Sequence, residues 1–453
     1  MKKIFKILLI TVGTLLGLVL VIFLVCFQKL DDTPLEQTAH FKKWQEIKTA
    51  FKSNAIESQS SIKVAWAKVN ITPPQPIALA GYGKRQGKSY DKVQDSVYVR
   101  VVAIEHASQS TFLLSADMLI VPPNVTKLFY ANLNKIGIDS SQVHISAIHS
   151  HNSIGTWGSS LTGELFAGKY NPEMEITLAA KFTEAVLAAK EDLMEGSISY
   201  GEINDIFDIR NRLGEVPNPE VDPEIRALTF NRTDGKKAIL VTYGAHSTVM
   251  DSKNISLSRD YSGMLVDSLE HHNYEFAMYM AGAVGSMGPV ENGKDDFEEL
   301  KHQSGGVFSH ITDILWQPVF NEKKIVESYL LPLPLREPNP KIFKNWGLRP
   351  WMFKKFFGDY PVNVKATRIG NVILIGMPCD FSGEMMNELD DYAKSKGYNL
   401  IVTSFNGGYM GYVTDEKRFD EDLYESTTMA WYGNQNGVYF SQVVKDLVDK
   451  IGE

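Results

Sequence analysis

Cysteine is nearly absent from this sequence of 453 residues, which contains only Cys26 and Cys379. Cys26 lies in an apolar N-terminal segment, so a disulfide bond between the two cysteines is implausible. The fold must therefore be stable without a disulfide, and a cysteine-based metal site is excluded.

An excess of basic residues is also lacking. Lysine and arginine number 46 against 54 aspartate and glutamate residues, which gives a net charge of −8. A surface that binds nucleic acid normally shifts this balance toward positive charge, so we expect no nucleic-acid partner. Apolar residues make up 44% of the chain and charged residues 22%, a globular composition with ample material for a core.

Long hydrophobic runs are missing except for one at the N-terminus. Residues 7–27 carry no charge, and at about 1.5 Å per residue they can cross a hydrocarbon core of roughly 30 Å. The run has no A-x-A-like cleavage site, so we interpret it as a transmembrane signal anchor, with a cleaved signal as the alternative. Lysines in residues 1–6 indicate a cytoplasmic tail, and the positive-inside rule then places the rest of the protein outside the cytoplasm, in the periplasm or the extracellular space.

The remainder is expected to consist of a polar stalk over residues 28–61 and one dense globular domain over residues 62–453. Apolar residues at helical spacing predict helices, and short β-branched or aromatic runs predict strands. The predicted helices are 179–193, 263–271, 383–396 and 438–451, and the predicted strands are 111–114, 143–148, 238–243, 276–280, 371–375 and 399–403. This alternation predicts an α/β fold class, a layered mixed sheet with flanking helices.

Polar or glycine-bearing segments follow each predicted strand. Asp117 follows the first strand, His149 and His151 follow the second, and His246 follows the third. In α/β sheets, functional groups gather in loops beyond the carboxyl ends of the strands. The sequence therefore predicts a site, and from its histidines a metal site, in loops at the strand ends.

The two histidines of "SAIHSHNSIG" allow two interpretations. On an extended backbone, side chains at i and i+2 point to the same face, so His149 and His151 could address one metal ion or form a hydrogen-bonded pair. His246 favours a metal, because neutral imidazole is a common zinc ligand and a zinc site usually needs three protein ligands. Asp380 is a candidate carboxylate ligand, although it could instead be the N-cap of the helix predicted over 383–396.

Two further segments also remain open to two interpretations each. Ser286 in "AGAVGSMGP" could be a nucleophile, but its surroundings do not match G-x-S-x-G, and the stretch could equally be a packing loop. Residues 343–361 mix aromatic side chains with lysine and arginine. That mixture suits an interfacial segment that enters the lipid headgroups, but it also suits an ordinary amphipathic core helix.

An ordered set of motifs resembles a known family. The stretches "WAKVNITPP", "LAGYG", "ISAIHSHNS", "VTYGAHSTVM", "AVGSMGP", "CDFSGE" and "GYVTDE" come in the order and spacing of the neutral/alkaline non-lysosomal ceramidases, which are zinc-dependent amidases that hydrolyse the N-acyl bond of ceramide. The resemblance covers residues 62–451 and implies a zinc cofactor and a lipid amide substrate. Because the sequence ends soon after the last motif, we expect it to lack the immunoglobulin-like C-terminal domain of typical members.

The resemblance also implies roles for individual residues. The family's zinc ligands fall on His149, His246, Asp380 and Tyr412, and its catalytic residues fall on His151, Arg212 and Tyr424. Two departures are present in this sequence. Asp380 replaces a glutamate and is one methylene shorter, and Gly288 stands where the family has its catalytic serine, with Ser286 two positions early.

The sequence thus predicts a membrane-anchored zinc-dependent amidohydrolase that cleaves an N-acyl bond of ceramide or a related lipid. Without the family serine, water could attack directly, Ser286 could reach the site, or the activity could be altered or lost. Two alternatives remain, namely a metal hydrolase with a non-lipid substrate and a non-catalytic lipid-binding protein that retains the fold. Gly288 supports the binding protein, whereas the histidine and tyrosine set argues against it.

Overall fold

A large mixed β-sheet forms the centre of the computed structural model, which describes residues 2–53, 55–214, 220–320 and 324–452. Its outer strands β12 and β6 pair in parallel with β10 and β5, while the pairs between them are antiparallel. In spatial order the strands are β12 (Phe276–Ala281), β10 (Lys237–Tyr243), β9 (Glu224–Arg232), β7 (Met194–Asn204), β2 (Ile62–Asn70), β4 (Tyr98–His106), β5 (Gln109–Ala116) and β6 (Val143–Ala147), and β14 (Gln317–Pro318) pairs with β7.

A second, four-stranded sheet packs against the first. Its strands run in the order β15 (Val326–Pro332), β18 (Asn363–Ile369), β19 (Val372–Gly376) and β21 (Asn399–Thr403). Leu113 of the large sheet and Leu374 and Ile401 of the small sheet belong to one buried cluster, which lies between the two sheets. Because each sheet buries both faces, its strands read as nearly continuous apolar runs.

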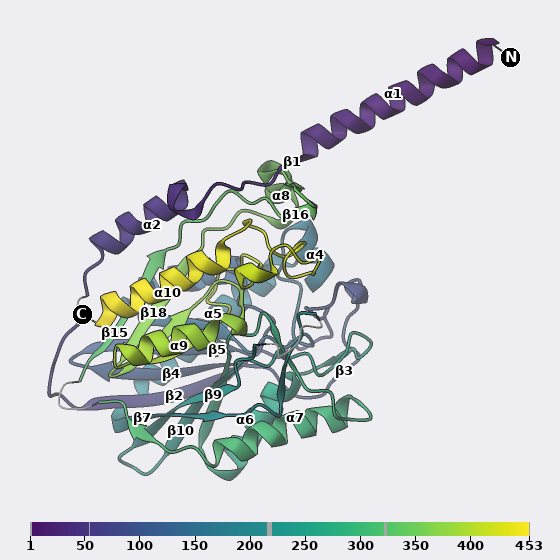
Figure 1. The fold of residues 1–453 in the computed structure, drawn as a ribbon. Helices are drawn as coiled ribbons and strands as arrows, with labels where there is room; N and C mark the ends of the chain where they lie inside the picture. The colour runs from purple at the N-terminus through teal and green to yellow at the C-terminus, as the bar shows by residue number, and fades with distance from the viewer. Residues whose placement is uncertain (1, 54, 215–219, 321–323, 453) are drawn as a thin grey trace.

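Helices cover the two outer faces, so the domain has four layers (Figure 1). The alternation of side chains along β5 shows how the layers are specified: Phe112 and Leu114 face the helices of the large sheet, and Leu113 faces the small sheet. The helices on the large sheet are α3 (Pro123–Lys135), α5 (Pro172–Glu191), α6 (Asp260–His272) and α7 (Asp296–Ile311), and those on the small sheet are α9 (Met386–Ser395) and α10 (Asn436–Gly452).

The predicted α/β class with flanking helices is confirmed. The predicted strands coincide with β5, β6, β10, β12, β19 and β21, and the predicted helices with α5, α6, α9 and α10. The helix predicted over 383–396 begins with one 3-10 turn, η4 (Gly383–Met385), before α9. Its N-cap is Ser382, whose side chain accepts a hydrogen bond from the backbone N–H of Glu384, so Asp380 is not the capping residue.

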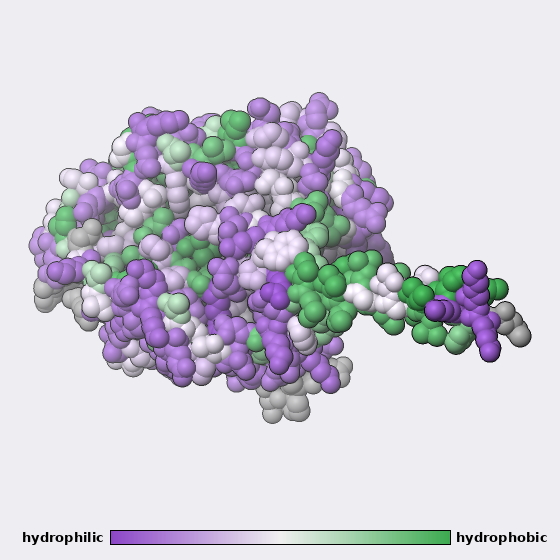
Figure 2. All heavy atoms as spheres, turned by 90° about the horizontal axis from the view of Figure 1, so that it is seen from above, coloured by the Kyte–Doolittle hydropathy of each residue, from purple (hydrophilic) through white to green (hydrophobic). Residues whose placement is uncertain are grey.

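The N-terminal helix α1 (Lys2–Cys26) extends away from the body (Figures 1 and 2). It is long and apolar enough to cross a membrane. Directly after it, β1 (Phe27–Lys29) pairs with β17 (Trp346–Leu348), which in turn pairs with β16 (Lys341–Phe343). The helix therefore enters the body through a small three-stranded sheet.

The segment expected to be a stalk lies against the body instead of standing apart from it. Helix α2 (Ala39–Ala50) packs beside α10 (Figure 1), with Trp44 fully buried. The Trp44 Nε1–H and the Lys48 ammonium both donate to Asp446, at 2.9 and 2.5 Å. The buried Trp44, with its indole N–H hydrogen-bonded, anchors this segment to the body, which the polar composition of the segment does not reveal.

Residues 343–361 contain an amphipathic helix that is partly buried in the body. Helix α8 (Pro350–Phe357) buries Phe353, which packs against Trp431, while Trp351 and Phe356 remain exposed. The segment therefore has one face in the protein interior and one aromatic face toward the surroundings.

Candidate metal centre

Loops at the ends of four strands converge on one point. His149 and His151 follow β6, and His246 follows β10. Asp380 begins β20 (Asp380–Phe381), which pairs in parallel with β22 (Tyr412–Val413) so that Asp380 lies opposite Tyr412. This arrangement brings together residues that are up to 263 positions apart in the chain.

The spacing of His149 and His151 suggested that their side chains converge through an extended backbone, but the structure shows a different backbone. Strand β6 ends at Ala147, and His149 has a φ of 63°, in the left-handed region. A non-glycine residue with this backbone is strained and persists only where the surroundings hold it. Here the His149 N–H donates to the carbonyl of Met118 at 3.0 Å, and its ring stacks on Phe405 at 4.0 Å between centroids.

Hydrogen bonds fix the tautomers of two of the rings. The Nδ1 atom of His149 lies 2.6 Å from the carbonyl of Leu119, and Nδ1 of His246 lies 3.2 Å from the carbonyl of Val284. Because a carbonyl only accepts, each Nδ1 carries a proton, and in the neutral form of each ring Nε2 then has a free lone pair. Yet the two Nε2 atoms are 2.8 Å apart, so two lone pairs face each other across the centre.

Asp380 adds another acceptor to the same point. Its Oδ1 lies 3.3 Å from Nε2 of His149 and has no hydrogen-bond donor within the described parts of the chain. Its other oxygen, Oδ2, accepts from the Tyr409 hydroxyl at 2.9 Å. A buried carboxylate oxygen without a donor is costly, and here it faces imidazole lone pairs.

His151 completes a triangle of imidazole nitrogens. Its Nε2 lies 3.2 Å from Nε2 of both His149 and His246. Nitrogens bound at about 2.0–2.1 Å to one tetrahedral ion lie roughly 3.3 Å apart, so the three rings fit a common ion. Burial holds the pKa of His151 well below its usual value, so this ring is neutral and able to bind a metal.

These atoms fit a metal cation and do not form a satisfied hydrogen-bond cluster. Three ring nitrogens and one carboxylate oxygen meet here, with no donor hydrogen-bonded to Oδ1 of Asp380 in the described parts of the chain, and a divalent ion would supply positive charge between them. Histidine ligands of metals commonly donate their other N–H to a carbonyl, as His149 and His246 do here. The predicted ligands His149, His246 and Asp380 are thus brought together, and His151 lies beside them, although its Nδ1 has no carbonyl partner like those of His149 and His246 in the described parts of the chain.

Arg212 and Tyr412 lie beside this cluster. The Arg212 guanidinium donates to Glu425 at 2.7 Å, to the carbonyl of Gly285 at 3.0 Å and to the Tyr412 hydroxyl at 3.2 Å. Burial and the Asp380 carboxylate raise the pKa of Tyr412 well above its usual value. Arg212 is held by β8 (Ile209–Asn211), the short strand that precedes it and pairs with β13 (Met287–Pro289).

Tyr424 lies further from the cluster than the other predicted residues. Its ring is 6.3 Å from that of Tyr412, and its side chain is about half exposed. Burial of the hydroxyl, with Asp380 and Glu425 nearby, raises its pKa to about 12, so the phenol is a neutral hydrogen-bond donor.

Ser286 and Gly288 differ in what surrounds them. The Ser286 hydroxyl accepts from Ser382 at 2.7 Å and from the Glu384 N–H at 3.3 Å, and the residue does not line the cavity that opens onto the histidines. Gly288 pairs with Arg210, and a Cβ added there would meet the Arg212 side chain at 3.5 Å, an ordinary contact. A serine would therefore fit at position 288 beside Arg212.

This cavity has a volume of about 720 Å³. It is large enough to bury much of a lipid-sized ligand, and aromatic side chains form a substantial part of its walls. The aromatic wall residues are Tyr82, Trp157, Phe166, Phe353, Phe357, Tyr360, Tyr409, Tyr412, Tyr424, Trp431 and Tyr432. Phe353 and Phe357 come from α8, whose first turn contacts the end of the N-terminal helix.

Sequence reasoning missed several supporting residues. Tyr409 donates to Asp380, Glu425 pairs with Arg212, and Phe405 stacks on His149. Each lies next to a recognised motif, in "SFNGGYMGYVTDE" or "LYEST", but no spacing rule connects it to its partner. Only the glycine-rich loop after β21 signalled that residues 405–411 approach the site closely.

Together, the four layers and the histidine–carboxylate cluster at the strand ends define an α/β domain built around a candidate metal centre. The sequence matches the family described as "Neutral/alkaline non-lysosomal ceramidase, N-terminal" over residues 63–293, just over half of the chain. The chain therefore belongs to the neutral/alkaline non-lysosomal ceramidase family. The matched stretch contains His149, His151, Arg212 and His246, whereas Asp380, Tyr412 and Tyr424 lie beyond it.

Solved structures share this fold. A crystal structure of neutral ceramidase from Pseudomonas aeruginosa aligns with a TM-score of 0.77 at 16% identity, covering 87% of this chain and 75% of that one. A ceramidase complexed with C2 aligns with a TM-score of 0.75 at 16% identity, covering 86% and 75%. A comparison with curated proteins gives no significant match.

Proposed function

We propose that this protein is a membrane-anchored, zinc-dependent amidohydrolase that cleaves the N-acyl bond of ceramide or a related lipid. The observation that carries the proposal is the acceptor-only centre, in which Nε2 of His149 lies 2.8 Å from Nε2 of His246 and 3.3 Å from an unpartnered Asp380 oxygen. Membership of the ceramidase family and the aromatic cavity support a lipid amide as the substrate.

In the proposed reaction, water adds across the amide C–N bond and releases a carboxylic acid and an amine. His149, His246, Asp380 and Tyr412 would hold the zinc ion, which polarises the carbonyl and lowers the pKa of water when it is bound. His151, whose ring is neutral, would accept a proton from water and pass it to the departing nitrogen. Arg212, with a guanidinium that Tyr412 and Glu425 orient, and the neutral Tyr424 hydroxyl would donate to the developing oxyanion.

Gly288 distinguishes this site from the pattern of its family. No hydroxyl is available at position 288, and Ser286 is engaged by Ser382 and the Glu384 N–H. The proposal therefore assigns the attack to water alone, with His151 as the proton acceptor. The alternative, a lipid-binding protein without activity, rests on the same glycine.

Membrane attachment is proposed on the basis of the N-terminal helix and the surface around it. Hydrophobic side chains gather where α1 leaves the body (Figure 2), and Phe23 of α1 packs against Trp346 of β17 at 4.9 Å between ring centroids. Arg349 donates to the carbonyl oxygens of Leu24 and Phe27, and the Trp351 Nε1–H donates to that of Val25. These contacts would hold the body against the bilayer surface.

This arrangement gives a lipid a short route to the centre. Helix α8 contacts the end of α1 through Trp351, and it lines the cavity through Phe353 and Phe357. Exposed Trp351 and Phe356 would lie among the lipid headgroups, as aromatic side chains at membrane interfaces do. With the lysines of residues 1–6 on the cytoplasmic side, the catalytic body would lie outside the cytoplasm.

Two measurements test the proposal. The full-length protein in detergent should release fatty acid and sphingoid base from ceramide, detected by mass spectrometry, should lose this activity on chelation and should regain it with Zn²⁺. A panel of N-acyl lipids and non-lipid amides is screened in parallel; a protein that cleaves none of them while retaining ceramide in a binding assay supports the non-catalytic alternative.

The membrane topology is tested separately. Protease added to intact cells, or to spheroplasts where an outer membrane is present, should digest the body, and a mature N-terminus near Gln28 would show a cleaved signal instead.

A further inference from the structure

A second cluster of potential metal ligands lies outside the cavity. It shares no residue with the histidine centre, which consists of His149, His151, His246 and Asp380. Asp205 and Asp208 belong to the loop between β7 and β8, and His302 and His310 belong to α7. One ligand atom each from Asp205, Asp208 and His310 lie within 4.8 Å of one another. Nε2 of His310 is 3.5 Å from Oδ1 of Asp205, and Nδ1 of His302 is 3.9 Å from Oδ1 of Asp208.

These separations are too long for good hydrogen bonds and suit ligands that surround an ion. Asp205 is fully buried, and its Oδ2 has no hydrogen-bond partner among the residues that the structure describes. Its Oδ1 accepts from the backbone N–H groups of Phe207 and Asp208, both at 3.2 Å, which fixes the carboxylate within the loop. A second carboxylate, that of Asp208, stands beside it and is also buried.

The helix is shaped to receive the Asp208 carboxylate. His302, Gly306 and His310 are spaced four residues apart and therefore lie on one face of α7. A Cβ at Gly306 would overlap the Asp208 carboxyl group, so only glycine lets that carboxylate sit between the two histidines. A Cβ added at the neighbouring Gly305 would meet nothing within 4 Å, so the requirement for glycine is confined to position 306.

We propose that Asp205, Asp208 and His310, assisted by His302, bind a second divalent metal ion, with zinc as the best match to this set of nitrogen and oxygen ligands. The ion would fasten the β7–β8 loop to α7. That loop leads directly into β8 and then into Arg212, so the ion would also stabilise the strand that presents Arg212 to the cavity. The site is structural and does not depend on the reaction proposed above.

The experiment measures metal content by elemental analysis of the full-length protein in detergent after equilibration with Zn²⁺ alone and removal of free metal. The wild type should hold about two zinc ions per chain. Gly306→Ala should hold one, because the added methyl group displaces the Asp208 carboxylate while every ligand is retained. Gly305→Ala is the matched control and should keep both, since both substitutions favour the helix equally.

Two further variants separate this site from the histidine centre. The double substitution Asp205→Asn with His310→Ala should remove the second ion only, and His149→Ala with His246→Ala should remove the other ion only. Zinc should raise the midpoint of thermal unfolding of the His149→Ala, His246→Ala protein, and this shift should vanish when Gly306→Ala is added.

A wild type with a single ion that the His149→Ala, His246→Ala protein loses would overturn the inference and leave the proposed function intact. The cluster would then be a set of histidine–carboxylate ion pairs. An Asp205→Asn, His310→Ala protein that keeps two ions would overturn the inference as well. Conversely, a single ion lost only with Asp205→Asn and His310→Ala supports the second site and refutes the first.

Discussion

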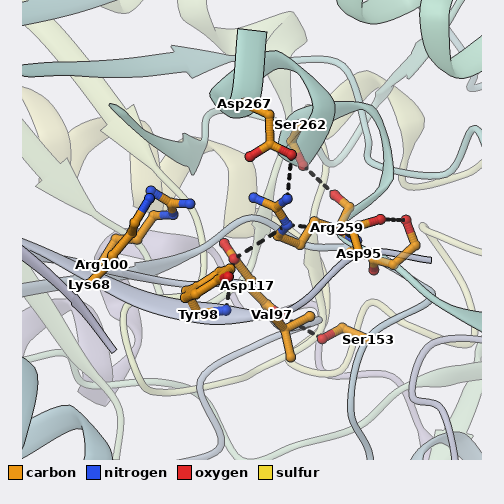
Figure 3. Close-up of polar contacts among 12 residues, drawn as sticks. Lys68, Asp95, Val97, Tyr98, Arg100, Asp117, Ser153, Arg259, Ser262 and Asp267 are labelled. Carbon is orange, nitrogen blue, oxygen red and sulfur yellow. Dashed lines mark hydrogen bonds and ion pairs between the residues drawn. The ribbon is translucent and has the colours of Figure 1, made fainter. Parts of the chain in front are cut away.

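Two buried clusters of polar groups in this protein differ in how their charges and hydrogen-bonding atoms are matched. In the Arg259 network, one guanidinium is surrounded by three carboxylates (Figure 3). Arg259 donates to Asp95 at 2.8 Å and to Asp267 at 2.6 Å, and it lies 3.9 Å from Asp117. In the histidine centre, defined as His149, His151, His246 and Asp380, acceptor atoms face acceptor atoms.

The difference separates a structural cluster from one built to hold a ligand. Every carboxylate of the Arg259 network meets a donor: the Tyr98 N–H donates to Asp117 at 2.9 Å, and the Ser258 hydroxyl donates to Asp95 at 2.7 Å. Burial of such a network is tolerated because its charges are paired and each carboxylate meets a donor, although Nη1 of Arg259 has no acceptor among the described residues. In the histidine centre, Oδ1 of Asp380 has no hydrogen-bond donor in the described chain although the Arg212 guanidinium lies nearby, so a bound cation would complete the match of its atoms.

The strongest test of this contrast removes the acceptors. His149→Ala combined with His246→Ala should eliminate the metal of this centre and lower amide hydrolysis by more than about 10³-fold, because several kcal/mol of transition-state stabilisation are lost with the metal. Metal content and turnover of the full-length protein measure this, with His271→Ala on exposed α6 surface as the control. Unchanged metal occupancy of this centre in the double variant would show that the ligands are wrong.

His151 tests whether the three imidazoles act alike. If His151 handles protons while His149 holds the metal, His151→Gln should lower turnover by about 10²–10⁴-fold with the metal still bound. The distances of 3.2 Å from its Nε2 to both other rings allow a second outcome, in which the variant loses the metal as well. Elemental analysis beside the rate measurement decides between a proton acceptor and a third ligand.

The sequence was sufficient to predict some of the helices and strands, but not β2, β4, β7 and β9 of the large sheet or helices α3 and α7, and not how the elements assemble. Strands such as β5 and β10 are visible because both faces are buried, which leaves continuous apolar runs between polar ends. The stacking of the small sheet on the large one is not visible, since the pairing of Leu113 with Leu374 and Ile401 joins positions about 260 or more apart. Likewise, no local pattern shows that Trp44 is buried against α10.

The gathering of the site residues at one place was predictable, but their geometry was not. Resemblance placed His149, His246, Asp380 and Tyr412 in one site, but two-residue strands such as β20 and β22 are too short to leave a periodic signal. The left-handed backbone of His149 overrode the extended geometry that its spacing implied. Tyr409 and Glu425 act through contacts made by the folded chain, which sequence patterns do not record.

On the structural side of the comparison, Arg259→Met should destabilise the fold and leave the metal in place. Removing the guanidinium takes one of two neighbouring positive charges from the buried Asp117, Arg100 being the other, and breaking a buried ion pair costs about 3–5 kcal/mol. Lys181→Met, which breaks an exposed ion pair with Glu184, should cost at most about 1 kcal/mol. Urea unfolding of the protein in detergent compares the two; a loss below about 1 kcal/mol for Arg259→Met would contradict the role of the network.

Asp117 gives the network a pH dependence. Burial raises its pKa to about 6 from the ordinary value of 3.8, although Arg100 and Arg259 oppose the rise. Between about pH 4 and 6 the folded state therefore binds more protons than the unfolded state, so stability falls as the pH rises, by up to roughly 3 kcal/mol. Asp117→Asn should remove this part of the slope, whereas Asp267→Asn, at the half-exposed end of the network, should retain it. Equal slopes in the wild type and Asp117→Asn would contradict the prediction.

The smallest effect is expected from Ser286→Ala. The Ser286 hydroxyl is buried and bonded to Ser382 and the Glu384 N–H, so it belongs to the structural kind. Its loss should cost about 1 kcal/mol of stability, the usual contribution of a hydrogen bond, and change turnover less than about threefold.

Gly288→Ser is the companion variant to Ser286→Ala, because its side chain fits beside Arg212 and places a hydroxyl at the position where the family has its serine. Full metal occupancy with an inactive Ser286→Ala protein and a nearly normal His151→Gln protein would reverse the assignment: a serine would then reach the substrate from two positions early, and His151 would be a structural neighbour of the metal ligand His149.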